Sequence, residues 1–182
     1  MIVAILKATM PVISVAHRGR SAQREEHNLL VRLNARVDYA LRAVVELVAA
    51  GGTAARPVTA ERLASGQAIP PKFLESILLQ LRRAGIVHSQ RGPDGGYWLA
   101  KPADEISLAD VIRIIDGPLA NVRGQRPEDL GYQGAAAALQ EVWIALRASE
   151  REILELVTVA DVVTGKLPKR VRTLAADPRA WV

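Results

Sequence analysis

The sequence contains no cysteine, and this absence excludes several kinds of site. Without thiols the chain cannot form disulfides, a thiolate metal site, a cysteine-ligated iron–sulfur cluster or a dithiol redox switch. Histidine is almost as scarce, because His17, His27 and His88 are scattered over 182 residues and offer little material for an imidazole metal centre. Aromatic residues make up only 4% of the chain, so we expect an aliphatic core, which suits helices better than strand sandwiches.

Long hydrophobic runs are also missing. The apolar stretch at residues 1–16 is interrupted by Lys7 and Pro11 and is too short to span a bilayer. The basic residues near this stretch follow it, whereas a secretory signal carries its positive charge first. Residues 19–28 are polar and lack the apolar spacing of a helix. We therefore expect residues 1–30 to form a disordered extension on a cytoplasmic protein with no membrane partner.

The net charge of +5 is distributed unevenly along the chain. Residues 31–102 carry ten basic and five acidic side chains, a net charge of +5, whereas residues 1–30 carry +2 and residues 103–182 carry −2. A basic block beside an acidic one is typical of a nucleic-acid module attached to a region that does not bind. Charge alone leaves open the alternative that this is an ordinary solvated surface whose uneven charge arose by chance.

Two helices are predicted at the start of the basic block. Apolar residues spaced three and four apart predict a helix over residues 35–50, which Gly51-Gly52 ends. Thr59 is a good N-cap for a second, short helix over residues 60–64, which Ser65-Gly66 closes.

A third helix is predicted over residues 71–84, because proline is tolerated in a first turn and Gly85 ends the apolar periodicity. Its buried stripe consists of Leu74, Ile77, Leu78 and Leu81. Its other face is polar and net basic, with Lys72, Glu75, Ser76, Gln80 and Arg83. Two helices joined by a tight glycine-containing link, the second with a hydrogen-bonding face, are typical of a helix-turn-helix.

A β-hairpin is predicted directly after these helices. Residues 86–89 and 97–100 indicate two strands, joined by Arg91-Gly92-Pro93-Asp94-Gly95-Gly96, and Asp-Gly in such a connection is a hairpin signal. Small residues let the loop approach a duplex closely, and Arg91 can reach phosphate or a narrow minor groove. A phosphate-cradling loop would open a helix, whereas this loop opens a strand, so we interpret the hairpin as a wing.

The acidic part predicts a short helix and a loop. Ser107-Leu108-Ala109-Asp110 matches the pattern of a capping box and opens a helix that Gly117-Pro118 ends. Residues 119–134 are rich in glycine and form a loop long enough to be functional or flexible. We expect residues 31–118 to form the DNA-binding domain and residues 161–182 to form a flexible basic tail.

A long helix is predicted over residues 135–160. Its apolar residues form a heptad-like stripe of Leu139, Val142, Trp143, Leu146, Ile153 and Leu156. The stripe either pairs with its copy in a second subunit or covers the winged helix of its own chain. Trp143 either packs in the core or joins Tyr132 in a site for an unidentified small-molecule or protein effector.

These elements together resemble a known family. The segment Asp38-Tyr39-Ala40-Leu41-Arg42-Ala43, the stretch from Ile69 to Gly85, the loop from Arg91 to Tyr97 and the stretch from Ile106 to Pro118 are similar to the Rrf2 family of bacterial winged-helix transcription regulators, of the IscR and NsrR type. The likeness spans about residues 31–165. Family members begin with Met-Arg-Leu, where this chain has Val31-Arg32-Leu33. The resemblance therefore suggests that translation starts at Val31 and that residues 1–30 are not made.

The resemblance implies a homodimer whose recognition helices enter the major groove and whose wings contact the adjacent minor groove. Lys72, Phe73, Glu75 and Ser76 match contact positions, and Arg91 matches the wing arginine. We expect the DNA-contacting set to be Pro71, Lys72, Phe73, Glu75, Ser76, Gln80, Arg83, Arg91, Gly92, Asp94 and Gly95. For Lys72 and Arg83, the alternative that they lie on an ordinary solvated helix face stays open.

The chain departs from the sensing members of the family because it lacks the cysteines that hold their iron–sulfur cluster. Sensing members carry three cysteines in the loop that corresponds to residues 119–136, and this loop has none. Asp38 matches a carboxylate ligand of one sensor branch, but alone it cannot hold a cluster, so we expect it to cap the helix or pair with an arginine. We expect no cofactor, no metal and no iron–sulfur cluster.

The sequence therefore predicts a mainly α-helical winged helix-turn-helix with a small β-hairpin and a long dimerisation helix. The predicted function is that of a sequence-specific, homodimeric repressor on a palindromic operator in double-stranded DNA. The alternative is a winged-helix module that binds another protein and does not bind DNA by itself. We do not expect an enzyme, because the sequence offers no Ser-His-Asp, paired-carboxylate, metal-ligand or phosphate-loop constellation.

Overall fold

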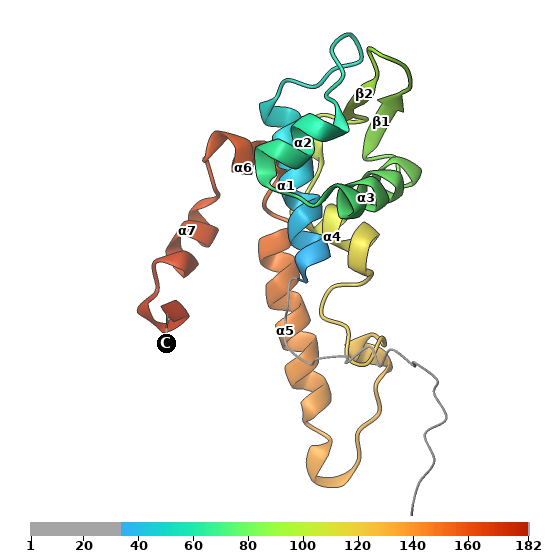
Figure 1. Cartoon of the computed structure of the whole chain (residues 1–182). Coiled ribbons are helices and arrows are strands. Elements are labelled where there is room, and N and C mark those ends of the chain that lie inside the picture. The colour runs from blue at the N-terminus through green and yellow to red at the C-terminus, as the bar shows by residue number, and fades with distance from the viewer. Residues whose placement is uncertain (1–33, 182) are drawn as a thin grey trace, which may run out of the picture.

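The computed structural model describes residues 34–181, with the side chain of residue 181 excepted, and the predicted extension over residues 1–30 and the start at Val31 lie outside this range. The described chain is mainly helical with one two-stranded antiparallel hairpin (Figure 1). Its elements are α1 (Ala35–Ala49), α2 (Ala60–Gln67), α3 (Pro71–Arg83), β1 (Val87–Gln90), β2 (Gly96–Leu99), α4 (Leu108–Asp116), α5 (Leu139–Leu154), α6 (Val159–Thr164) and α7 (Lys169–Ala175). Short 3-10 turns interrupt the loops.

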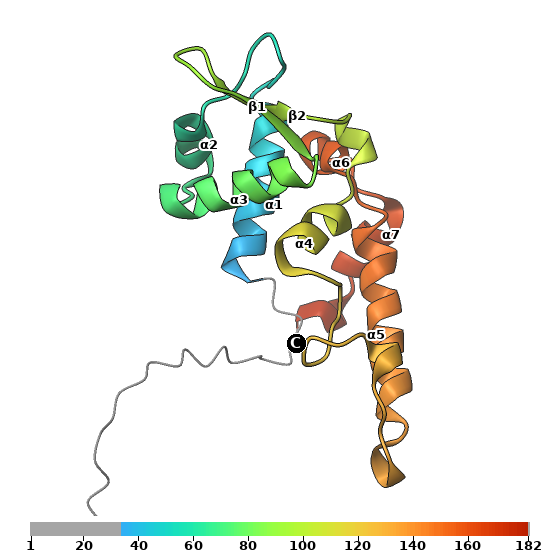
Figure 2. The same cartoon turned by 90° about the vertical axis from the view of Figure 1, so that its right-hand side faces the viewer.

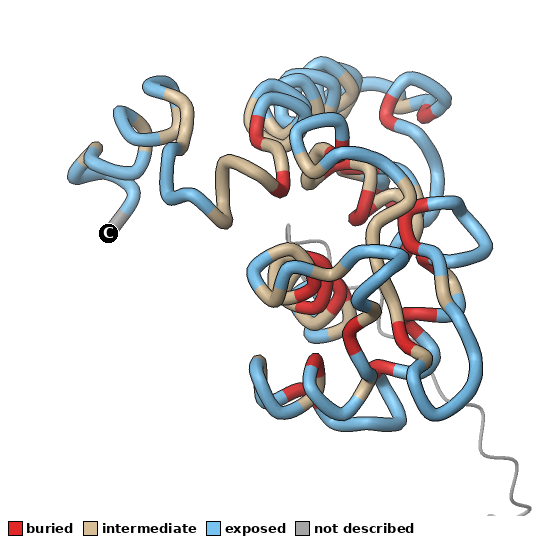
Figure 3. Tube along the Cα trace, turned by 90° about the horizontal axis from the view of Figure 1, so that it is seen from above, coloured by how far each residue is buried: buried red, intermediate tan, exposed pale blue. Residues whose placement is uncertain are grey.

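The helix α1 lies at the centre of the winged helix, with α2, α3, α4 and α6 packed around it (Figure 1). The predicted stripe of α3 is sealed in this core, because Leu74, Ile77, Leu78 and Leu81 are each at most 1% exposed. Every buried residue of the main cluster is aliphatic, as the low aromatic content predicts. Figure 3 shows the buried residues gathered around these helices, whereas the arm that ends at the C-terminus is exposed or half-buried.

The turn between α2 and α3 is held by side chains of α1. The guanidinium of Arg42 donates from Nη1 to the Gln67 carbonyl (2.7 Å), and the Gln67 amide donates to Glu46 Oε2 (2.7 Å). Arg42 also pairs with Asp38 at 2.8 Å, so of the two roles expected for Asp38 the structure shows the pairing with an arginine. The helix cap is Asn34, whose side chain accepts from the Val37 amide.

The helix α2 is longer than the pattern predicts. It continues through Ser65 and Gly66 and ends at Ala68, which adopts the left-handed conformation (φ 51°). Gly66 does not stop the helix and instead packs against α1, where a Cβ would lie 2.9 Å from the carboxylate of Glu46 and would displace that side chain.

The hairpin pairs Val87 with Leu99 and Gln90 with Gly96, one residue away from each predicted strand boundary. The chain before α2 adds a further pairing, in which the Val58 amide donates to the Tyr97 carbonyl (2.9 Å) and the Tyr97 amide donates back (2.8 Å). Gly96 is needed at this contact, because a Cβ would lie 2.5 Å from the Val58 carbonyl oxygen.

The long helix predicted over residues 135–160 is shorter at both ends in the structure, where α5 spans Leu139–Leu154. Gly134, at φ 59°, opens a 3-10 turn, so α5 begins at Leu139. The helix ends at Leu154, and Thr158 forms a capping box with Asp161 that starts α6 in a new direction. The same device opens α4, where Ser107 and Asp110 form the predicted capping box.

The tail over residues 161–182 contains ordered helices where flexibility is predicted. It includes the end of α6, the helix α7 and a 3-10 turn over residues 178–181. Pro168 precedes α7 in an extended conformation, and Arg170 of α7 pairs with Glu152 of α5 at 2.9 Å. In the described residues, no helix is long and apolar enough to cross a membrane.

We expect Gly96→Ala to lower the free energy of unfolding by about 1–3 kcal/mol, because the new methyl group would press against the backbone of Val58. Urea denaturation followed by circular dichroism measures this change. Gly131→Ala is the matched control, since a Cβ at Gly131 would meet nothing within 4 Å. Equal stability of the two variants would contradict the packing of the wing against Val58.

Candidate nucleic-acid interface

The helix α3 presents the predicted polar residues on the side opposite its buried stripe. Pro71, Lys72, Phe73, Glu75, Ser76 and Arg83 are exposed, and Gln80 is half-buried. The helix also carries an exposed apolar residue that the pattern did not single out, Leu79. In Figure 2, α2, α3 and the tip of the wing lie on one side of the molecule, and α5 lies on the other.

The first turn of α3 combines apolar and hydrogen-bonding groups. Phe73 is 52% exposed, and its ring lies 6.0 Å from that of Tyr39 on α1, which holds it in place. The Ser76 hydroxyl donates to the Phe73 carbonyl (2.9 Å), so it meets an outside partner as an acceptor. An apolar ring suits contact with a thymine methyl group, and hydroxyl and amide groups suit the edges of bases.

The tip of the wing exposes Arg91, Gly92 and Asp94 to solvent. Gly92 adopts φ 111°, a conformation that favours glycine. Gly95 has a structural role, because it is half-buried and a Cβ there would lie 2.4 Å from the Gln90 carbonyl oxygen. Gly95 therefore shapes the hairpin that presents Arg91.

The cations of this face make no ion pairs among the described residues. This set consists of Lys72, Arg82, Arg83 and Arg91. Arg82 donates from Nη1 to Ser89 Oγ at 3.3 Å, which connects α3 to β1. Arginines on the other side of the molecule, such as Arg147 and Arg151, are paired with carboxylates. Positive charge is thus left available beside α3 and the wing.

Sequence reasoning missed three exposed residues close to this face. Thr53 and Arg56 lie in the loop that precedes α2, which runs beside the wing because Val58 pairs with Tyr97. Arg62 lies on α2 and is also exposed. No sequence pattern marks the pairing of one isolated residue with a distant strand, so the basic loop could not be assigned to the wing in advance.

The helix α5 exposes much of the predicted dimerisation stripe. Leu139, Val142 and Leu146 are between 39% and 53% exposed, and Ile153 is half-buried. Leu156 is exposed but lies beyond the end of the helix. Trp143 is turned toward the loop of its own chain, where its indole N–H donates to the Tyr132 hydroxyl at 3.1 Å. Ile144, 43% exposed, lies outside the predicted stripe.

A helix-turn-helix whose second helix has an exposed polar face, followed by a hairpin with a basic tip, defines a winged helix-turn-helix DNA-binding protein. The family model of Rrf2, described as an iron-dependent transcriptional regulator, matches residues 33–165. The chain belongs to the Rrf2 family of transcriptional regulators, which are not enzymes.

Individual relatives agree with this assignment. The chain is 52% identical over 151 residues to Rv1287 of Mycobacterium tuberculosis, which is provisionally named an HTH-type transcriptional regulator, and the match covers 82% of this chain and 92% of that protein. The structure of CymR, the global cysteine regulator of B. subtilis, is similar with a TM-score of 0.62 and 28% identity, over 74% of this chain and 98% of that one. The structure of T. potens IscR gives a TM-score of 0.59 and 27% identity, over 75% and 88%.

The iron in the family description does not fit the residues of this chain. The chain has no cysteine, and the segment over residues 117–138 has no histidine. Among the described residues, no group of three or more His, Asp or Glu side chains is placed to hold a metal ion. The region that would face such a group is instead rich in arginine, which cannot ligate a cation.

We expect Arg91→Ala to weaken binding to a selected DNA site by about 1–3 kcal/mol, because the exposed wing arginine makes no competing ion pair. Fluorescence anisotropy with labelled duplex at physiological salt measures the affinity. Arg123→Ala removes the same charge from the loop before α5 and is the control. Wild-type affinity of Arg91→Ala would show that the wing does not contact DNA.

Proposed function

We propose that this protein is a homodimeric repressor that reads a palindromic DNA operator without an iron–sulfur cluster. The observation that carries the proposal is the exposed face of α3, whose hydrogen-bonding side chains lie beside cations that no carboxylate of the described residues neutralises. Such a face suits both base edges and phosphates. The protein acts in the cytoplasm, where it meets the chromosome.

Each recognition helix enters a major groove with the exposed face of its first three turns. Glu75, Ser76 and Gln80 meet base edges, while Lys72, Arg82 and Arg83 meet phosphates. Arg91 reaches the neighbouring minor groove, supported by the tight hairpin that Gly95 allows. The exposed loop with Arg56 adds a phosphate contact next to the wing.

The apolar stripe of α5 supports the dimer. Leu139, Val142, Leu146 and Ile153 lie within about 60° of one another around a helix with 3.6 residues per turn. The loop of the same chain covers a different side of α5, where Gln140 donates to the Pro127 and Glu128 carbonyls and Arg147 pairs with Glu128. The stripe stays available for a second copy, and two copies about a twofold axis match two half-sites of a palindrome.

Repression is then steric, because a dimer on its operator covers DNA that the transcription machinery needs.

The alternative of a module that binds only another protein is not favoured by the family, whose matched relatives are transcriptional regulators.

We expect Lys72→Ala to weaken binding to all DNA sequences similarly and to lower the salt dependence of the affinity by about one unit of slope. Ser76→Ala is expected to change the bases selected at one position of each half-site. Selection from random DNA, followed by titrations at several salt concentrations, measures both effects, with Lys166→Ala as the charge control. Failure of the wild-type protein to bind random DNA at low salt would overturn the proposed function.

We expect Leu146→Glu to convert the dimer to a monomer, because the carboxylate would be buried in the apolar contact between two α5 helices. Light scattering coupled to size-exclusion chromatography measures the mass in solution. Ile144→Glu is the matched control, since Ile144 is similarly exposed on a different side of the same helix. A wild-type monomer, or equal masses for the two variants, would contradict a dimer through this stripe.

A further inference from the structure

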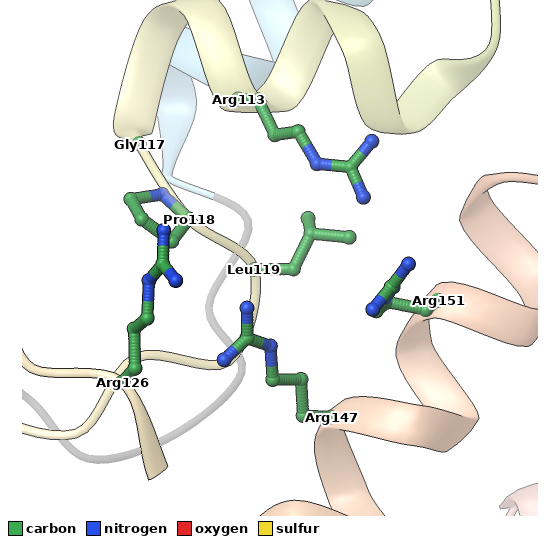
Figure 4. Close-up of a pocket in the computed structure, with 7 residues that line it drawn as sticks. All are labelled: Arg113, Gly117, Pro118, Leu119, Arg126, Arg147 and Arg151. Carbon is green, nitrogen blue, oxygen red and sulfur yellow. The ribbon is translucent and has the colours of Figure 1, made fainter. Parts of the chain in front are cut away.

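Four arginines converge on one cavity between α4, the loop that follows it and α5 (Figure 4). The cavity has a volume of about 270 Å³ and is lined by Arg113, Gly117, Pro118, Leu119, Arg126, Arg147 and Arg151. Figure 4 shows the guanidinium groups of Arg113, Arg147 and Arg151 around the Leu119 side chain, and that of Arg126 beside Pro118. No acidic side chain is among the lining residues.

The neighbouring carboxylates neutralise this cluster only in part. Glu155 is shared by Arg113 and Arg151, and hydrogen bonds from these arginines hold the pKa of its carboxyl below the usual range. Arg113 also pairs with Asp110 at 3.7 Å. Glu128 pairs with Arg147 at 2.5 Å. Arg126 makes no ion pair with any described residue. Four guanidinium groups thus face one space, with the acids at its edge.

One buried donor of a lining residue has no acceptor. The Nε of Arg147 is buried and donates to no described residue, although buried N–H groups are almost always paired. The same is true of Arg42 Nε, but that guanidinium lies over the Tyr39 ring at 4.9 Å. No aromatic ring lies over Arg147 in the described chain, so this guanidinium keeps unused hydrogen-bonding capacity next to the cavity.

We propose that this cavity binds a small organic or inorganic anion whose carboxylate or phosphoryl oxygens carry at least two negative charges. The planar guanidinium fork matches such oxygens with paired, charge-assisted hydrogen bonds. The volume is at the small end of ligand sites, which excludes a nucleotide and suits a dicarboxylate or a phosphate. Leu119 provides the apolar floor against which a short carbon chain can lie.

Such an anion would couple the two halves of the protein. Arg113 belongs to α4, which packs on α1 in the winged helix, whereas Arg147 and Arg151 belong to α5, none of whose residues is buried. A ligand that joins them fixes the direction of α5 relative to the recognition helix. This regulatory consequence rests on the proposed function, because it acts on DNA only through the α5 dimer.

Calorimetric titration of the full chain with inorganic phosphate and with succinate, at constant ionic strength set by potassium chloride, tests the binding. We expect at least one of the two probes to bind, and we expect Arg126→Gln to weaken that binding about tenfold. Arg126 is exposed and makes no ion pair, so its loss leaves the fold intact, which an unchanged melting temperature verifies. Arg123→Gln removes the same charge three residues away, outside the cavity, and should bind as the wild type does.

The proposal is overturned if neither probe binds, or if Arg126→Gln and Arg123→Gln bind alike, because binding would then reflect general charge. DNA titrations with and without the bound probe test the coupling, and we expect the affinity to change at least threefold. An unchanged DNA affinity would overturn the regulation and leave the anion site standing. Absence of DNA binding by the wild type would overturn the proposed function and leave the calorimetric result unaffected.

Discussion

The position of the recognition helix depends on one arginine of α1. Arg42 donates to the Gln67 carbonyl at the end of α2, while its charge is balanced by Asp38 and its face lies over Tyr39. Tyr39 in turn contacts Phe73 in the first turn of α3. The chain between α2 and α3 is therefore held by side chains of α1. This arrangement explains why the segment from Asp38 to Arg42 is part of the resemblance to other regulators: it sets where α3 begins.

The charges of the molecule are used in two different ways. Around α3 and the wing, cations are left without partners among the described residues, so phosphates can take that role. Around α5, arginines pair with carboxylates from other segments, as Arg113 does with Glu155 and Arg170 with Glu152. In the proposed function the first group serves DNA binding, whereas the second connects α4, α5 and α7 by ion pairs. The net charge of +5 is a total over the whole chain and does not show this difference between unpaired and paired cations.

The sequence predicts the parts of this fold that depend on local patterns. Apolar spacing located α1 and α3, and the capping box at Ser107 located α4, because each signal lies within a few residues. It failed where distant residues contribute, as at the end of α2, where Gln67 forms hydrogen bonds with Arg42 and Glu46 of α1. The contact of α7 with α5 depends in the same way on the pair of Arg170 and Glu152, whereas the start of α6 at Thr158 has a local capping-box signal that the prediction of one long helix overlooked. The arginine cavity joins residues up to 38 positions apart, so no spacing rule could have assembled it.

The bridge between Ser107 and Thr158 has a consequence for how the protein can be divided. The Leu108 amide donates to the Val157 carbonyl and the Val159 amide donates to the Ile106 carbonyl, which brings α6 back to the core of the winged helix. Val159 is fully buried there, with Leu154 and Val163 packed beside it. The DNA-binding unit is therefore discontinuous: it consists of residues up to about 118 and a second segment that returns after α5. A fragment cut after Pro118 would expose the apolar seat of α6, so the smallest autonomous unit includes α5.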